Sequence, residues 1–227
     1  MVKSPKQQST SIVLVGKFDP AIFQPMWFVN KGLLTEQEVK KAKVNLSEDY
    51  LISFELDWLH LEVVRERFII STSANEEEET IRDLTTGIFS ILTETPLSMI
   101  GINVESHFQL DNEDNYHSFG HKLAPKNIWN KFMKKPGLMA LTIKDVRENG
   151  YKGYMRVKVA TSLVVKPFGI CIATNDHYEM PETEIKEGED SKALPSGVDF
   201  FMKLLADEWN KSIEYSKTIM AKLIEEA

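Results

Sequence analysis

Three of the five histidines, His107, His117 and His121, lie within fifteen residues of one another, among Asp and Glu side chains. Imidazole and carboxylate groups are suitable ligands for a transition metal, so the pattern supports one hypothesis, a metal-dependent hydrolase or nuclease. His117 and His121 would share a face only in a helix, and Gly120 with its polar neighbours predicts a loop. No HExxH sequence or calcium-binding loop accompanies them. We therefore expect a solvated acidic loop and no bound catalytic metal.

A second chemical pair, Asp176 and His177, follows a predicted strand that ends at about residue 173. Loops at strand ends often carry chemistry, yet neighbouring residues of an extended chain point apart, and Asn175-Asp176 is typical of a turn. The only cysteine, Cys171, lies in an apolar strand, where a thiol is usually inert. The sequence contains no Gly-x-Ser-x-Gly motif and no phosphate-binding glycine loop. We therefore expect no catalytic residue and no cofactor.

The segment from Ser98 to Leu110 predicts the central strand. Its residues alternate between an apolar side and a polar side, and strand side chains alternate in the same way between the two faces of a sheet. The polar side includes Asn103, Glu105 and His107. We interpret these three residues as candidates for contact with a ligand or partner.

A hairpin centred on Asn149-Gly150 carries several basic residues. The chain as a whole has 27 basic and 34 acidic residues and a net charge of −7, which argues against broad binding to a phosphate backbone. We therefore restrict the nucleic-acid hypothesis to this hairpin, and a solvated hairpin face is the competing interpretation. The basic residues are Lys144, Lys152, Arg156 and Lys158.

Two apolar segments suit a protein partner, because aromatic residues and methionine are enriched in interface cores. One is residues 21–28, and the other is a terminal helix predicted from Gly197 to about Glu225. We expect association with another protein or with a second copy, and the competing account is that a curved sheet buries both segments. The candidates are Trp27, Phe28, Trp209, Leu223 and Ile224.

The elements that must position these residues predict an α+β fold. We expect a single antiparallel sheet of about seven strands with helices on one face. Residues 11–95 and 96–227 have the same order of strand, helix, strands and helix, so we divide the predicted domain, 11–227, into two similar halves. Residues 1–10 are polar and predict a flexible N-terminal tail.

Composition excludes several classes of protein. The 227 residues are sufficient for a sizeable core, and 42% of them are hydrophobic, as in ordinary globular proteins. No apolar run approaches the roughly 20 residues of a membrane span, so we expect no membrane association. A single cysteine forms no internal disulfide, which favours a reducing, cytoplasmic location.

Three segments carry a family resemblance: SIVLVGKFDP (11–20), GINVESHF (101–108) and NDHYE (175–179). In these segments the chain resembles a sporadically distributed family of uncharacterised prokaryotic proteins. The resemblance implies a role in conflict with phage or mobile elements, such as antiviral defence, and transfers no site residues. The duplicated order of elements is similar to TATA-binding-protein-like and helix-grip folds.

Three hypotheses of function follow. The first is a non-catalytic binding or adaptor protein that acts in a prokaryotic complex. The second is the metal-dependent hydrolase or nuclease built on the histidine cluster. The third is a protein that binds a small apolar ligand in a helix-grip cavity. The absence of a nucleophile motif, a phosphate loop and tight metal-ligand spacing favours the first.

Overall fold

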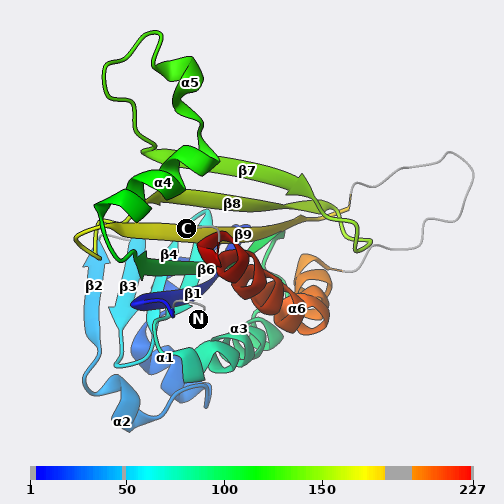
Figure 1. The fold of residues 1–227 in the computed structure, drawn as a ribbon. Helices are drawn as coiled ribbons and strands as arrows, with labels where there is room; N and C mark the ends of the chain where they lie inside the picture. Colours follow the sequence, from blue (N-terminus) through cyan, green and yellow to red (C-terminus); the bar gives the residue numbers. More distant parts are fainter. Residues whose placement is uncertain (1–3, 48–49, 182–195, 226–227) are drawn as a thin grey trace, which may run out of the picture.

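The computed structural model describes residues 4–47, 50–181 and 196–225 (Figure 1). Among these residues the fold is α+β, with one antiparallel sheet of nine strands. The strands are β1 (Gln7–Gly16), β2 (Lys43–Ser47), β3 (Leu51–Glu55), β4 (His60–Val64), β5 (Arg67–Thr72), β6 (Leu97–Gln109), β7 (Ala140–Val146), β8 (Gly153–Thr161) and β9 (Gly169–Glu179).

Six α-helices accompany the sheet in the described part of the chain. The two long ones, α3 and α6, lie next to each other in front of the sheet in Figure 1, and α5 projects beyond β7. None of the helices in the described ranges is both long enough and apolar enough to cross a membrane. The helices are α1 (Pro25–Asn30), α2 (Glu36–Val39), α3 (Glu78–Ile91), α4 (Glu113–Leu123), α5 (Lys126–Trp129) and α6 (Gly197–Glu225).

The two halves of the chain meet where β1 pairs with β6. The strand order across the sheet is β2-β3-β4-β5-β1-β6-β9-β8-β7. Counted outward from this seam, one half runs β1, β5, β4, β3 and β2, and the other runs β6, β9, β8 and β7. Each half therefore places its last strand beside its first, and the central ladder is contributed by both.

The core lies on one face of the sheet, where cross-strand partners such as Ile12 and Ile102 are buried. Helices α1, α3 and α6 all contact side chains of this face, because the register places those side chains on the same side of the sheet. The contacts are Phe54 with Phe28 of α1, Phe68 with Phe89 of α3, and Tyr178 with Ser212 of α6.

The segment predicted as the central strand is β6, which pairs with β1 on one side and β9 on the other. Ile102, Val104 and Phe108 are buried on the core face, and the alternate residues, including Asn103 and Glu105, face the other way. The predicted alternation therefore describes this strand correctly.

The sheet has nine strands rather than about seven. One of them is β2, which begins at Lys43 because residues 43–47 pair with β3. Two boundaries also differ from the sequence prediction. β1 begins at Gln7, so part of the predicted tail is a strand paired with β6. β9 continues to Glu179 through the predicted turn at Asn175-Asp176, because β6 and β8 pair with it on both sides.

The terminal helix is confirmed as α6. Its first turn is capped by Ser196, whose Oγ accepts a hydrogen bond from the Asp199 N–H at 3.1 Å. We predicted a long loop between the last strand and this helix, and residues 182–195 of that loop lie outside the described residues.

Candidate functional site

Polar side chains cross the outer face of the sheet, opposite the core face, in one register row. Each residue of the row is the cross-strand partner of the next, and partners in a ladder point to the same face. We call this set the polar row. It comprises Ser71 of β5, Ser11 of β1, Asn103 of β6, Asn175 of β9, Arg156 of β8 and Lys144 of β7.

The outer face is hollowed over this row into a groove of about 670 Å³, which we call the outer groove. Hydroxyl and amide groups from β5, β1, β6 and β9 form its floor, and β8 supplies two cationic side chains. Because the lining side chains stand on hydrogen-bonded strands, their positions are fixed before any ligand arrives.

Two asparagines hold each other at the centre of the groove. Asn175 Nδ2 donates a hydrogen bond to Asn103 Oδ1, and Asn103 Nδ2 donates to the carbonyl oxygens of Ser11 and Gly101 at 3.4 and 3.3 Å. Gly101 leaves room for this pair, since a Cβ atom there would lie 2.8 Å from Asn175 Nδ2. The geometry fixes both amides in the floor of the groove, where each remains partly exposed.

The positive and negative side chains of the groove lie on different strands. Arg156 and Lys158 line its β8 side, and none of the described carboxylates forms an ion pair with either. Glu105 lies on the β6 side with its side chain half exposed. Ala173 is the cross-strand partner of both Glu105 and Lys158, and its small side chain leaves the space between the two charges open.

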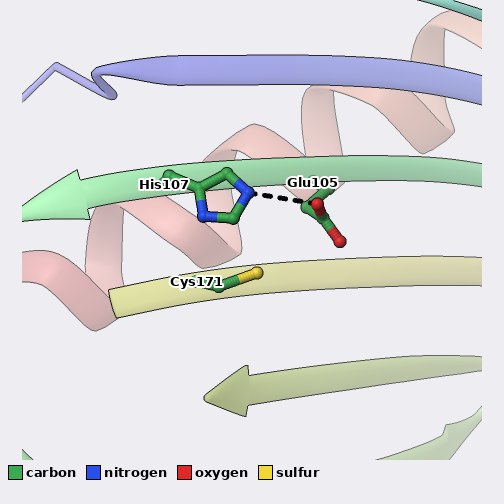
Figure 2. A group of neighbouring side chains, drawn as sticks. All are labelled: Glu105, His107 and Cys171. Carbon is green, nitrogen blue, oxygen red and sulfur yellow. Dashed lines mark hydrogen bonds and ion pairs between the residues drawn. The ribbon is translucent and has the colours of Figure 1, made fainter. Parts of the chain in front are cut away.

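Glu105 belongs to a three-residue cluster with His107 and Cys171 (Figure 2). One potential ligand atom from each residue lies within 4.8 Å of the other two. His107 Nε2 is 3.1 Å from Glu105 Oε1, while His107 Nδ1 is 2.9 Å from Ser162 Oγ. Glutamate, histidine and cysteine are all metal ligands, so the fit of the cluster to a metal depends on their protonation.

Ser162 determines which nitrogen of His107 carries the proton. Its Oγ already accepts hydrogen bonds from the backbone N–H groups of Val164 and Val165, at 3.2 and 2.8 Å. Both lone pairs are then used, so the Ser162 hydroxyl donates to His107 Nδ1. The neutral imidazole consequently carries its proton on Nε2 and donates it to Glu105.

This arrangement does not suit a metal ligand. A histidine that binds a metal through Nε2 normally donates from Nδ1 to an outer acceptor, and here Nδ1 is itself an acceptor. Burial, with Glu105 as a smaller cause, raises the pKa of the Cys171 thiol to about 11, so the thiol of the metal-free cluster is protonated. The cluster acts instead to orient the Glu105 carboxylate at one side of the groove.

The predicted acidic loop with surface histidines is wrong in its structure, because residues 113–123 form helix α4. Asn112 caps it by accepting a hydrogen bond from the Asn115 N–H at 2.8 Å. His117 and His121 therefore share a helix face, with stacked rings 6.2 Å apart. Among the described residues, Glu105, His107 and Cys171 form the only group of three potential metal ligands. His117 and His121 do not belong to it.

Asp176 and His177 point to opposite faces of β9. Asp176 is buried on the core face, where its Oδ2 accepts hydrogen bonds from Arg147 at 2.7 Å, Tyr178 at 2.9 Å and Ser212. His177 is on the outer face and stacks on Tyr154, with ring centroids 4.5 Å apart. Burial lowers the pKa of His177. The two side chains do not form a catalytic pair.

The basic hairpin contributes three of its four predicted residues to the outer face. Lys144, Arg156 and Lys158 lie on that face, and the Lys144 ammonium is 4.0 Å from the centre of the Tyr154 ring. Lys152 lies in the turn before β8, 3.4 Å from Glu179.

The apolar candidates belong largely to the core. Phe28, Trp209 and Ile224 are buried, and Trp27 and Leu223 are partly buried against the core cluster. The curved sheet and its helices account for these side chains, so they do not form an exposed apolar surface.

Sequence reasoning missed Asn175 as a groove residue, because residue types do not alternate along β9. Its buried positions include the polar residues Thr174 and Asp176, whereas its outward positions include Cys171 and Ala173. The turn propensity of Asn-Asp obscured the strand further.

A scan against protein-family models found no match to this chain, and a search of curated proteins found none either.

Proposed function

We propose that this protein is a non-catalytic binding or adaptor protein, and that the outer groove holds an extended acidic segment of a partner protein. The observation that supports it is the preformed groove of about 670 Å³, lined by hydroxyls, amides and two cations on neighbouring strands. A surface built on rigid strands and supplied with hydrogen-bonding groups is suited to recognition.

The chemistry of the lining favours a peptide as the ligand. A primary amide offers one acceptor oxygen and two donor hydrogens, which complement the N–H and C=O groups of an extended backbone. Asn175 and the serines provide such groups along the row, whereas Asn103 offers only its Oδ1, because both of its Nδ2 hydrogens are donated to backbone carbonyls. Arg156 and Lys158 favour acidic side chains, and Glu105 repels them, so an acidic segment is expected to place its charges on the β8 side.

A photo-crosslinking amino acid at Thr142, an exposed groove position, tests this proposal in the cells that make the protein. We expect discrete adducts that resist nuclease and that contain peptides of a second protein. The same amino acid at Thr86, exposed on α3, is the matched control and should give none of these adducts. Nuclease-sensitive adducts, or identical adducts from both positions, would contradict the proposal.

Charge reversal on the β8 side tests the assignment of the contact. Arg156→Glu with Lys158→Glu should abolish the adducts formed at Thr142, because the acidic segment would then be repelled. The matched control is Lys40→Glu with Lys41→Glu, which makes the same change of charge at exposed positions following α2. Equal loss in both variants would show that net charge rather than the groove governs the contact.

A further inference from the structure

A second concave site lies on a different part of the molecule, between α4, the segment before β7, and strands β8 and β9. It is a cavity of about 370 Å³, within the ~300–1,000 Å³ typical of small-molecule sites. Its walls are mainly apolar and include Phe119, Leu138, Val159 and Ile170. It shares no lining residue with the outer groove.

A smaller cavity of about 210 Å³ adjoins the first, since both are lined by His121, Leu138 and Met139. Its other walls include Trp129 of α5 and Met133. Together the linings of the two cavities extend from Val159 and Thr161 of β8 to Trp129 of α5. Helix α5 itself projects beyond β7 in Figure 1.

One polar atom in these cavities has no partner. His121 Nε2 is buried, and none of the described residues forms a hydrogen bond with it. Burial, followed by the nearby positive charges of Lys126 and His117, lowers the pKa of His121 and so favours its neutral imidazole. A buried nitrogen without a partner is unfavourable, and a polar group of a ligand would satisfy it.

The cavities lie in a strongly basic part of an acidic protein. Residues 115–144 contain six lysines and no aspartate or glutamate, whereas the whole chain has a net charge of −7. Lys126 itself lines the smaller cavity beside His121. A ligand here is therefore expected to be apolar over most of its length and negatively charged at one end.

We propose that the two adjoining cavities bind an amphipathic anion, with its apolar chain against Leu138, Val159 and Ile170 and its acidic group at His121 and Lys126. Free fatty-acid carboxylates and acidic phospholipids share this chemistry. The site is independent of the acidic segment in the outer groove, so each can be tested without the other.

The direct test is calorimetric titration of the full chain with dodecanoate, with dodecanol as the uncharged probe of equal chain length. We expect saturable binding of dodecanoate and weaker binding of dodecanol. Lys126→Glu should weaken dodecanoate binding about tenfold, as expected for loss of a charge-assisted contact, and leave dodecanol unchanged. Equal binding of the two probes to the native protein would overturn the charged-end assignment.

Variants that block the cavity distinguish binding inside it from binding on the exposed surface. Leu138→Trp adds volume at a partly buried position outside the strands, and far-ultraviolet circular dichroism checks that the fold is retained. His121→Phe removes the unpartnered nitrogen while keeping a ring. Both variants should weaken dodecanoate binding about tenfold, whereas Arg156→Glu should leave it unchanged. Absence of dodecanoate binding to the native chain would overturn the proposal, unless the phospholipid vesicles bind as described next.

Vesicles distinguish the two sources of the ligand. The native protein would then cosediment with phosphatidylglycerol vesicles but not with phosphatidylcholine vesicles, and Leu138→Trp would abolish this cosedimentation. That result would identify the ligand as a phospholipid taken from a bilayer. Dodecanoate binding without cosedimentation would identify a free fatty acid. Cosedimentation that persists in Leu138→Trp would place the contact on the exposed lysines and apolar side chains, and would overturn the cavity assignment.

Discussion

Glu105 shows how one side chain decides between metal chemistry and recognition. Its carboxylate accepts a hydrogen bond from His107 Nε2, because Ser162 fixes the imidazole tautomer through Nδ1. A metal would require the opposite tautomer and a Cys171 thiolate. The same hydrogen bonds hold the negative charge at one side of the outer groove, across Ala173 from Lys158. The groove therefore has a negative side and a positive side, which would orient a charged ligand.

The first residue-scale prediction concerns Phe108, which is 4% exposed on the core face of β6. Phe108→Ala should lower the free energy of unfolding by roughly 3–5 kcal/mol, through lost burial and the cavity left behind. Urea denaturation measures this loss. Gln109→Ala is the control on the next residue, which faces outward, and should cost less than about 1 kcal/mol. A similarly small loss for Phe108→Ala would contradict its place in the core.

The second residue-scale prediction concerns the buried contact of Asp176 with Arg147. Asp176→Asn should lower the free energy of unfolding by about 3 kcal/mol, because the Arg147 guanidinium would lose its counter-charge in a largely buried position. The matched control is Asp207→Asn, which changes an exposed carboxylate bonded to Tyr151 and should cost under about 0.5 kcal/mol. Equal losses in urea denaturation would contradict a structural role for the Asp176 contact.

At the scale of elements, the sequence predicted the strands and helices whose hydrophobic pattern agrees with the burial of their residues in the fold. Strand β6 and helix α6 were found from alternation and from helical spacing. Helix α4 was missed, because Gly120 and a polar composition are locally typical of a loop, whereas Asn112 and the packing of Phe119 stabilise a helix. The end of β9 was missed because pairing with β6 and β8 overrides the turn propensity of Asn-Asp.

The capping box of α2 gives an element-scale prediction with a pH dependence. Thr35 and Glu38 form the reciprocal hydrogen bonds of a capping box, and the hydrogen bonds from Thr35 lower the pKa of Glu38. Thr35→Ala should cost about 1 kcal/mol of unfolding free energy at pH 7. Since a carboxyl with a lowered folded-state pKa stabilises above its unfolded pKa, this cost should shrink as pH falls through the folded pKa.

Urea denaturation of the native protein and the variant at pH 7 and at about pH 3, below the ordinary pKa of glutamate, provides the measurement. Glu38→Gln is the control, because it lacks the titrating carboxyl group. In a protein that carries Glu38→Gln, the cost of Thr35→Ala should not change with pH. A cost of Thr35→Ala that stays constant over this range would contradict the role assigned to the Glu38 carboxylate.

At the scale of the whole molecule, the sequence predicted two halves with the same order of elements, but it did not predict the sites. It also did not predict that the first strands of the two halves pair, as β1 and β6 do. The outer groove depends on register across six strands, and the lateral alignment of Asn103, Asn175 and Arg156 arises only when the whole sheet is assembled. Spacing within one segment cannot supply that information.

The last prediction concerns α6 and the association that its apolar residues suggested. Ile224 is 5% exposed and Leu223 is packed against the core cluster, so the end of α6 belongs to the fold of one chain. Lys217 of α6 also pairs with Glu78 of α3 at 2.7 Å. Leu223→Asp with Ile224→Asp should therefore lower the free energy of unfolding by at least about 3 kcal/mol, because a carboxylate would be placed in an apolar site.

Urea denaturation combined with sedimentation over a wide range of concentration distinguishes folding from association. Lys222→Asp introduces the same side chain at the exposed neighbouring position and should leave the free energy of unfolding within about 0.5 kcal/mol of the native value. If the double variant instead kept its stability and only its sedimenting mass fell, the end of α6 would be an interface between copies. A loss of stability without a change in the mass of the folded species would assign these side chains to the core.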